Sequence, residues 1–223
     1  MTLIAPSTKE QIVLAAERLF AEHGIDGVSL RQIGAAAGNG NNSAVQYHFG
    51  SKDRLVQAVF EHRLPRMRER RELLIAEHRP DDLRSWVACL VRWMLEQSEL
   101  DGSYFQSFVA MLHQYGRREA FTLVADDFLA AMRDDHEQLA TYLGHIVEPL
   151  RAHRITQARV LIVHAAADRE RARATGQVVL PFAVALADLV DAMVGFLEAP
   201  VSAASRDALE RAHPTSVTRH AVR

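Results

Sequence analysis

Short polar side chains follow a turn rich in glycine and asparagine, at Asn41, Asn42, Ser43 and Gln46. The amides of Asn and Gln can each bond N6 and N7 of adenine as a bidentate pair, which is worth about 1 to 3 kcal/mol of discrimination between bases. Asparagine is also a preferred helix cap, so Asn41 and Asn42 are equally explained as residues that begin a helix. The pattern therefore predicts either the reading of DNA base edges or simple capping.

Two short helices are expected on either side of this turn. Ser29 can cap the first helix while Gln32 reaches back to it in a capping box, and Gly38 is the expected left-handed stop. The segment after Gly38 tolerates positive φ, and Asn41 or Asn42 would then cap the second helix.

A longer amphipathic helix precedes this pair. It is expected to begin near Ser7 or Thr8 and to end at Gly24, and Phe49 should close the three-helix unit as a core residue. A capped helix, a turn and a second capped helix, built on a preceding helix, are typical of a helix-turn-helix domain. The second helix of that motif enters the major groove of DNA.

Two segments carry a family resemblance, SLRQIGAAAG (residues 29–38) and VQYHFGSKDRL (residues 45–55). They resemble the N-terminal domain of the tetracycline-repressor (TetR) family of regulators, over roughly residues 8–60. The resemblance implies a ligand-responsive transcriptional regulator, a repressor that binds a palindromic operator as a dimer and is released by a small molecule.

The resemblance also implies that Tyr47, His48 and Lys52 hold the DNA backbone. Elementary electrostatics agrees, because Lys52 is a point charge beside a helix N-terminus, where free N–H groups also favour phosphate. Thr8 and Ser29 stand at two other helix starts and are candidates for the same contact. The DNA-binding residues predicted from the sequence are Thr8, Ser29, Arg31, Asn41, Asn42, Ser43, Gln46, Tyr47, His48 and Lys52.

The chain departs from the usual pattern of that family in two places. The turn over residues 38–43 is one residue longer than is typical, and Gln46 stands where the family often has an aromatic residue that touches phosphate. Gln46 could therefore read a base instead of contacting a phosphate.

Helical periodicity dominates the rest of the chain, so the predicted fold class is all-α. An N-terminal three-helix DNA-binding domain (1–54) is expected to precede a helical regulatory and dimerisation domain (55–200) and a tail (201–223). Pro65 should kink or break the helix that follows Ser51 near Leu64. Further helices are expected at about 81–98, 104–115, 125–147, 149–175 and 180–199. The tail should hold a short surface helix and fray from Pro214.

Aromatic and methionine side chains in the second half could line a pocket for a small molecule. Trp86 and Trp93 lie seven residues apart, hence on one helix face, and similar stripes follow in the next helices. Considered singly, each of these residues is better explained by ordinary core packing. The predicted ligand-binding residues, which include two histidines as polar anchors, are Trp86, Trp93, Phe105, Phe108, Met111, His113, Met132 and His136.

The helix expected at 180–199 is apolar nearly all round, which requires burial on several sides. The resemblance implies that it forms a four-helix dimer interface with the helix at 149–175, which carries small and branched residues such as Ala158, Leu161 and Ala165. A two-fold dimer also suits a palindromic site, because its recognition helices lie about 34 Å apart. An internal helix of a monomer is the alternative.

No enzyme chemistry is visible in the sequence. The phosphate-binding GxxxxGK[ST], the GxSxG and the HExxH motifs are missing, and the Gly38-x-Gly40 pair follows no strand. No two of the 11 histidines lie three or four residues apart, so no helical metal pair is predicted. Neither enzyme activity, a cofactor nor a metal is expected.

Net charge, cysteine content and the length of apolar runs limit the compartment and the partners of the protein. The net charge of −2 excludes a generally basic protein, so DNA binding must depend on a local surface. Cys89 is the only cysteine, and neither a signal peptide nor a run of about 18 apolar residues is present, so a cytoplasmic protein without membrane contact is expected. The functional alternative to a regulator is a helical small-molecule sensor or sequestering protein without operator binding.

Overall fold

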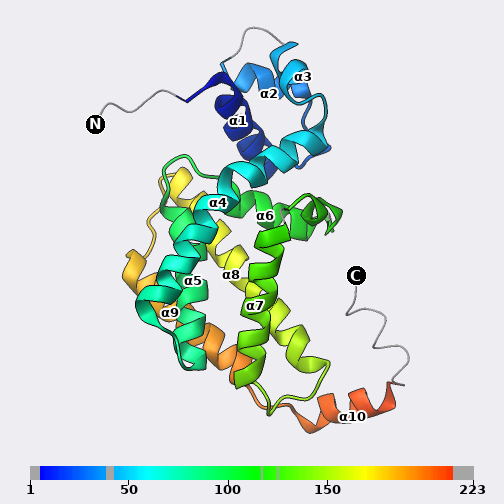
Figure 1. Cartoon of the computed structure of the whole chain (residues 1–223), viewed down its shortest axis with the longest axis vertical. Helices are drawn as coiled ribbons and strands as arrows, with labels where there is room; N and C mark the ends of the chain where they lie inside the picture. Colours follow the sequence, from blue (N-terminus) through cyan, green and yellow to red (C-terminus); the bar gives the residue numbers. More distant parts are fainter. Residues whose placement is uncertain (1–5, 39–42, 117, 125, 213–223) are drawn as a thin grey trace.

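A computed structural model describes residues 6–38, 43–116, 118–124 and 126–212, and all regular structure in these residues is helical (Figure 1). The α-helices and two 3₁₀ helices (η) are α1 Thr8–His23, α2 Leu30–Ala36, α3 Ser43–His48, α4 Lys52–His78, α5 Leu83–Glu96, η1 Gln97–Glu99, α6 Phe105–Gln114, η2 Arg118–Leu123, α7 Asp126–Tyr142, α8 Leu150–Ala174, α9 Phe182–Glu198 and α10 Ala203–Arg211. The all-α prediction is confirmed.

Side-chain caps define the ends of the first helices, as the sequence predicts. The Ser7 hydroxyl accepts a hydrogen bond from the backbone N–H of Glu10, and Ser29 and Gln32 form the complete capping box at α2. Gly24 and Gly38 have φ of 74° and 71°, positive values that glycine adopts at low cost where a helix ends. Asn41 and Asn42, the predicted caps of α3, lie outside the described residues.

Helix α4 continues through Pro65, although a break near Leu64 is one of the two predicted outcomes. The helix changes direction along its length (Figure 1), as the predicted kink requires. Leu64 and Met67 are buried on either side of the exposed Pro65, so packing of this face offsets the backbone hydrogen bond that proline removes. The predicted domain boundary after residue 54 falls in the first turn of α4, so this helix belongs to both parts of the chain.

The three N-terminal helices are joined to the rest of the molecule by continuous packing. Helix α1 lies against α4 and α6, α6 lies against α8, and α5 lies against α9. The Phe108 ring of α6 lies 6.3 Å from that of Phe20 in α1 and 5.6 Å from that of Phe60 in α4 (centroid to centroid). One hydrophobic core therefore extends from the N-terminal unit into the helical bundle.

The C-terminal half differs from the prediction in its helix ends. Helix α7 stops at Tyr142, five residues before the predicted end, and η2 fills part of the predicted gap before it. Pro181 precedes α9 as its N-cap instead of lying inside the first turn. Helix α10 buries no residue and is the predicted surface helix, whereas the predicted fraying from Pro214 falls outside the described residues.

Candidate nucleic-acid interface and ligand cavity

Helix α3 presents three consecutive polar side chains to solvent. Gln46, Tyr47 and His48 are exposed, and Tyr47 is 86% exposed, which is unusual for a tyrosine. The Tyr47 ring meets the His48 ring edge-on, with centroids 5.2 Å apart. Val45 and Phe49 are buried on the opposite face, which confirms Phe49 as core.

Close packing of α2 on α3 holds this face in place. A Cβ atom on Gly34 would lie 3.2 Å from Cγ2 of Val45, a tight contact, so the two helices are closely packed at this glycine. The scaffold predicted from caps and apolar spacing thus positions the exposed residues of α3.

Two of the predicted phosphate contacts already have partners within the chain. The Lys52 ammonium donates to the backbone carbonyl oxygens of Ile25 and Asp26, at 2.8 and 3.3 Å, and is half-buried. The Ser29 hydroxyl accepts from the backbone N–H of Gln32 in the capping box. Lysine carries three N–H donors, so one donor of Lys52 remains for a phosphate.

The other predicted DNA contacts are placed as follows. Thr8 and Arg31 are exposed at the starts of α1 and α2. Ser43 is the first residue of α3, but its side chain, like Asn41 and Asn42, lies outside what the structure describes. The structure therefore brings Gln46, Tyr47 and His48 together on one exposed helix.

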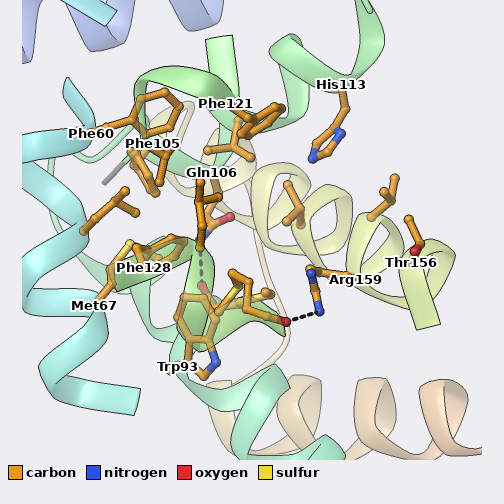
Figure 2. Close-up of a pocket in the computed structure, with 18 residues that line it drawn as sticks. Phe60, Met67, Trp93, Phe105, Gln106, His113, Phe121, Phe128, Thr156 and Arg159 are labelled. Carbon is orange, nitrogen blue, oxygen red and sulfur yellow. Dashed lines mark hydrogen bonds between the residues drawn. The ribbon is translucent and has the colours of Figure 1, made fainter. Parts of the chain in front are cut away.

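A cavity of about 260 Å³ lies among α4, α5, α6, η2, α7 and α8 (Figure 2). Four residues that were predicted to bind a ligand line it, namely Trp93, Phe105, His113 and Met132. The volume is just below the range of about 300 to 1,000 Å³ that is usual for small-molecule sites.

The other four predicted ligand-binding residues do not line this cavity. Phe108 and Met111 are buried in the core, and Trp86 borders a smaller hollow between α4, α5 and α7. His136 is half-buried, and burial, followed by the nearby charge of Arg159, holds its pKa below the usual range of histidine. A regular seven-residue spacing placed Trp86 and Trp93 on similar helix faces without showing which of them would border an opening.

Several lining residues were not among those predicted from the sequence. They include Phe60, Leu64 and Met67 of α4, Phe121 of η2, Phe128 of α7, and Thr156 and Arg159 of α8. An arginine within an otherwise apolar stripe of the helix expected at 149–175 is the one local signal that could have indicated Arg159.

Few polar groups interrupt the apolar lining (Figure 2). Gln106 donates from Nε2 to the carbonyl oxygen of Met94 at 3.1 Å, and the His113 ring lies 5.1 Å from that of Phe121. Arg159 donates from Nη2 to the carbonyl oxygen of Met132 at 3.1 Å. Its Nε atom is buried and has no hydrogen-bond partner among the described residues.

Buried carboxylates connect the N-terminal unit to the elements around the cavity. Glu17 of α1 is fully buried and pairs with Arg63 of α4, while it also accepts from the backbone N–H of Tyr104 at the start of α6. Glu170 of α8 accepts from the backbone N–H of Ser107, in the first turn of α6, at 2.8 Å. The start of α6 is thus held by two carboxylates from different helices.

Other kinds of site were sought in the same part of the chain. Among the described residues, no group of His, Cys, Asp and Glu could hold a metal ion. None of the helices described is long and apolar enough to cross a membrane.

Sequence comparison places the N-terminal unit in a known family. Residues 12–59 match the family of bacterial regulatory proteins named tetR. The chain is 35% identical over 63 residues to the HTH-type transcriptional repressor AcnR of Corynebacterium efficiens, and equally to AcnR of Corynebacterium glutamicum. That match covers 28% of this chain and 33% of AcnR, so the chain spans about a third of the length of the curated relatives it matches.

Structure comparison covers most of the chain. The fatty acid degradation regulator FadR of Bacillus halodurans is similar over 87% of this chain and 98% of its own, with a TM-score of 0.58 and 16% identity. NalD, the secondary repressor of the MexAB-OprM multidrug efflux pump in Pseudomonas aeruginosa, is similar over 84% and 94%, with a TM-score of 0.53 and 21% identity. At these identities the likeness shows a shared fold. The family that residues 12–59 match consists of bacterial regulatory proteins, so the N-terminal unit of the chain is a tetR-family domain.

Proposed function

We propose that the protein is a transcriptional repressor in the cytoplasm that binds a palindromic operator as a dimer and is released by a small molecule. The observation that carries the proposal is the exposed Gln46-Tyr47-His48 face of α3 on a capped, close-packed scaffold. Exposed amide, phenol and imidazole groups on a second helix of this kind supply donors for base edges and phosphates. The match of residues 12–59 to a family of regulators supports the same conclusion.

Apolar surface on α8 and α9 supports the dimer. Leu161 of α8 and Val184 of α9 are 42% and 50% exposed, and Leu180 just before α9 is 57% exposed. Within one chain, α9 buries only Val190, Met193 and Leu197, although the helix is apolar almost all round. A second copy that covers this surface would remove the exposed side chains from water and relate the two α3 helices by a two-fold axis.

The cavity supports control by a small molecule. It is lined mainly by apolar side chains with a few polar groups, the usual character of a ligand site. FadR of Bacillus subtilis, which is 16% identical with a TM-score of 0.50, was solved in complex with stearoyl-CoA. The elements that line the cavity, α4 and α6, also contact α1, so occupation of the cavity can bias the position of the N-terminal unit.

The proposal is tested by selection of genomic fragments on the purified protein, followed by sequencing. An enriched inverted repeat is expected, with half-sites about one helical turn apart. The variant Tyr47→Ala should lose the enrichment, whereas Tyr115→Ala, which removes another exposed tyrosine, should retain it.

The alternative is a sensor of the same fold that does not bind an operator. The engagement of Lys52 with two carbonyl oxygens favours it, because this charge is then partly withdrawn from DNA. Failure to enrich any repeat from the genome of the source organism, together with retained binding of a small molecule, would support the sensor and contradict the repressor.

A further inference from the structure

Arg159 has no carboxylate partner among the described residues, unlike three other arginines that are wholly or partly buried. Arg63 pairs with Glu17, Arg71 with Asp135 and Arg169 with Glu99. In contrast, the guanidinium of Arg159 makes one hydrogen bond to the carbonyl oxygen of Met132, and its buried Nε has no acceptor among the described residues. A buried charge without a counterion destabilises the folded protein, so a negatively charged ligand beside Arg159 would be stabilising.

The acidic group that acts on Arg159 is already hydrogen-bonded to another arginine. Asp135 is the one carboxylate with an electrostatic effect on Arg159, but both of its oxygens accept from Nε of Arg71 at 3.0 Å. Burial, the dominant influence, lowers the pKa of Arg159 below the usual range of arginine. The guanidinium group therefore lies in an apolar wall, and its Nε–H donor has no acceptor among the described residues.

The rest of the cavity requires an apolar ligand of limited size. Aromatic and methionine side chains, including Phe60, Phe105, Phe128, Trp93 and Met67, form the wall together with leucine and valine (Figure 2). Trp93 adds a second buried donor, since its Nε1 has no partner within the described residues. The exposed Thr156, one turn before Arg159 on α8, places the rim of the cavity close to the arginine.

We propose that the cavity binds a small monocarboxylic acid, with the carboxylate on Arg159 and the apolar body among the aromatic side chains. A planar carboxylate accepts two parallel hydrogen bonds from a guanidinium group, which supplies both the missing acceptors and the missing negative charge. That this acid is the effector rests on the proposed function. Binding of the acid to the cavity does not, because it is measured without DNA.

The test is calorimetric titration of the full chain with octanoate, decanoate and 4-phenylbutyrate, each compared with its methyl ester. The ester keeps the apolar body and the carbonyl group but carries no negative charge. At least one acid should bind with a Kd below 1 mM and about 10- to 100-fold more tightly than its ester, as expected for hydrogen bonds to a charged group.

Variants of Arg159 separate a ligand contact from a structural role. Arg159→Met should lose the preference for the acid while it still binds the ester, and Arg159→Lys should restore part of that preference. Arg151→Met is the matched control on the same helix, because Arg151 pairs with Glu148 outside the cavity. A folded state is verified for each variant by circular dichroism.

Three results would overturn the proposal. One is that no acid of the panel binds below 1 mM. Another is that acid and ester bind equally well, and the third is that Arg159→Met, folded as the wild type, retains the preference for the acid. None of these results depends on operator binding, so they are distinct from a failure of the repressor function.

Discussion

Arg63 of α4 donates two hydrogen bonds to Glu17 in α1, one from Nε and one from Nη2. Each goes to a different carboxylate oxygen, and each is 2.7 Å long. The same carboxylate accepts a hydrogen bond of 2.9 Å from the backbone N–H of Tyr104, the N-cap of α6. Burial of the pair excludes competing water, and the hydrogen bonds and charge of Glu17 outweigh this burial and raise the pKa of Arg63. One carboxylate thus joins the first helix of the N-terminal unit to two helices that line the cavity.

Removal of this carboxylate should destabilise the protein strongly. Glu17→Ala leaves the buried Arg63 unpaired, and we expect the free energy of unfolding to fall by about 3 to 5 kcal/mol in urea titrations. Glu96→Ala is the control, because the Arg70–Glu96 pair is partly exposed and should contribute about 1 kcal/mol or less. Equal losses in the two variants would show that Glu17 does not hold the helices together.

Gln46 should contribute specificity without contributing stability. Because its side chain is exposed on α3, Gln46→Ala should leave the unfolding free energy within about 0.5 kcal/mol of the wild type. We expect it to relax the preference at one base pair by about 1 to 3 kcal/mol, measured by competition with single-base variants of the operator. An equal loss of affinity for every sequence would mean that Gln46 contacts phosphate and not a base.

Lys52 should have two separable roles. Lys52→Ala removes the hydrogen bonds to the carbonyl oxygens of Ile25 and Asp26, which should lower the unfolding free energy by about 1 to 2 kcal/mol. If the third N–H donor binds phosphate, affinity for all duplexes should also fall. The slope of the logarithm of the binding constant against the logarithm of the salt concentration should then decrease in magnitude by about one. Arg31→Ala is the comparison, since Arg31 is exposed and its loss should weaken DNA binding without loss of stability. A normal salt dependence in Lys52→Ala would reduce this lysine to a structural role.

His136 should report on the charge of Arg159. In the native protein its pKa is lowered first by burial and then by Arg159, so Arg159→Met should raise that pKa only part of the way to the ordinary value. As pH falls, the unfolded chain binds this proton before the native chain does. The free energy of unfolding therefore decreases as pH falls from the ordinary pKa of histidine towards the lowered native pKa of His136. The pKa is measured by NMR titration of the imidazole signals. An unchanged pKa in the variant would show that the two groups do not interact.

The N-terminal unit is predictable from the sequence because its determinants are local. The Ser29–Gln32 capping box and the stop at Gly38 each involve residues within a few positions of one another, and the structure contains both. Phe49 follows from its place at the end of a short helix. The continuation of α4 through Pro65 is less predictable, because it depends on packing against other helices.

The cavity is only partly predictable, because it is formed by segments far apart in the chain. Helical spacing identifies apolar faces, and that was sufficient for Trp93, Phe105, His113 and Met132. Spacing does not show whether a face meets another helix or an opening, which is why Phe108 is core and Phe128 borders the cavity. The isolation of Arg159 is invisible in the sequence, since it arises from the pairing of Asp135 with Arg71 across helices.

The central claim is that the exposed face of α3 reads a specific DNA sequence. The most direct measurement is the ratio of two dissociation constants at one stated salt concentration, for the selected palindrome and for a duplex of the same composition with scrambled half-sites. The account predicts that the palindrome binds at least ~10³-fold more tightly. Equal dissociation constants for the two duplexes would contradict it.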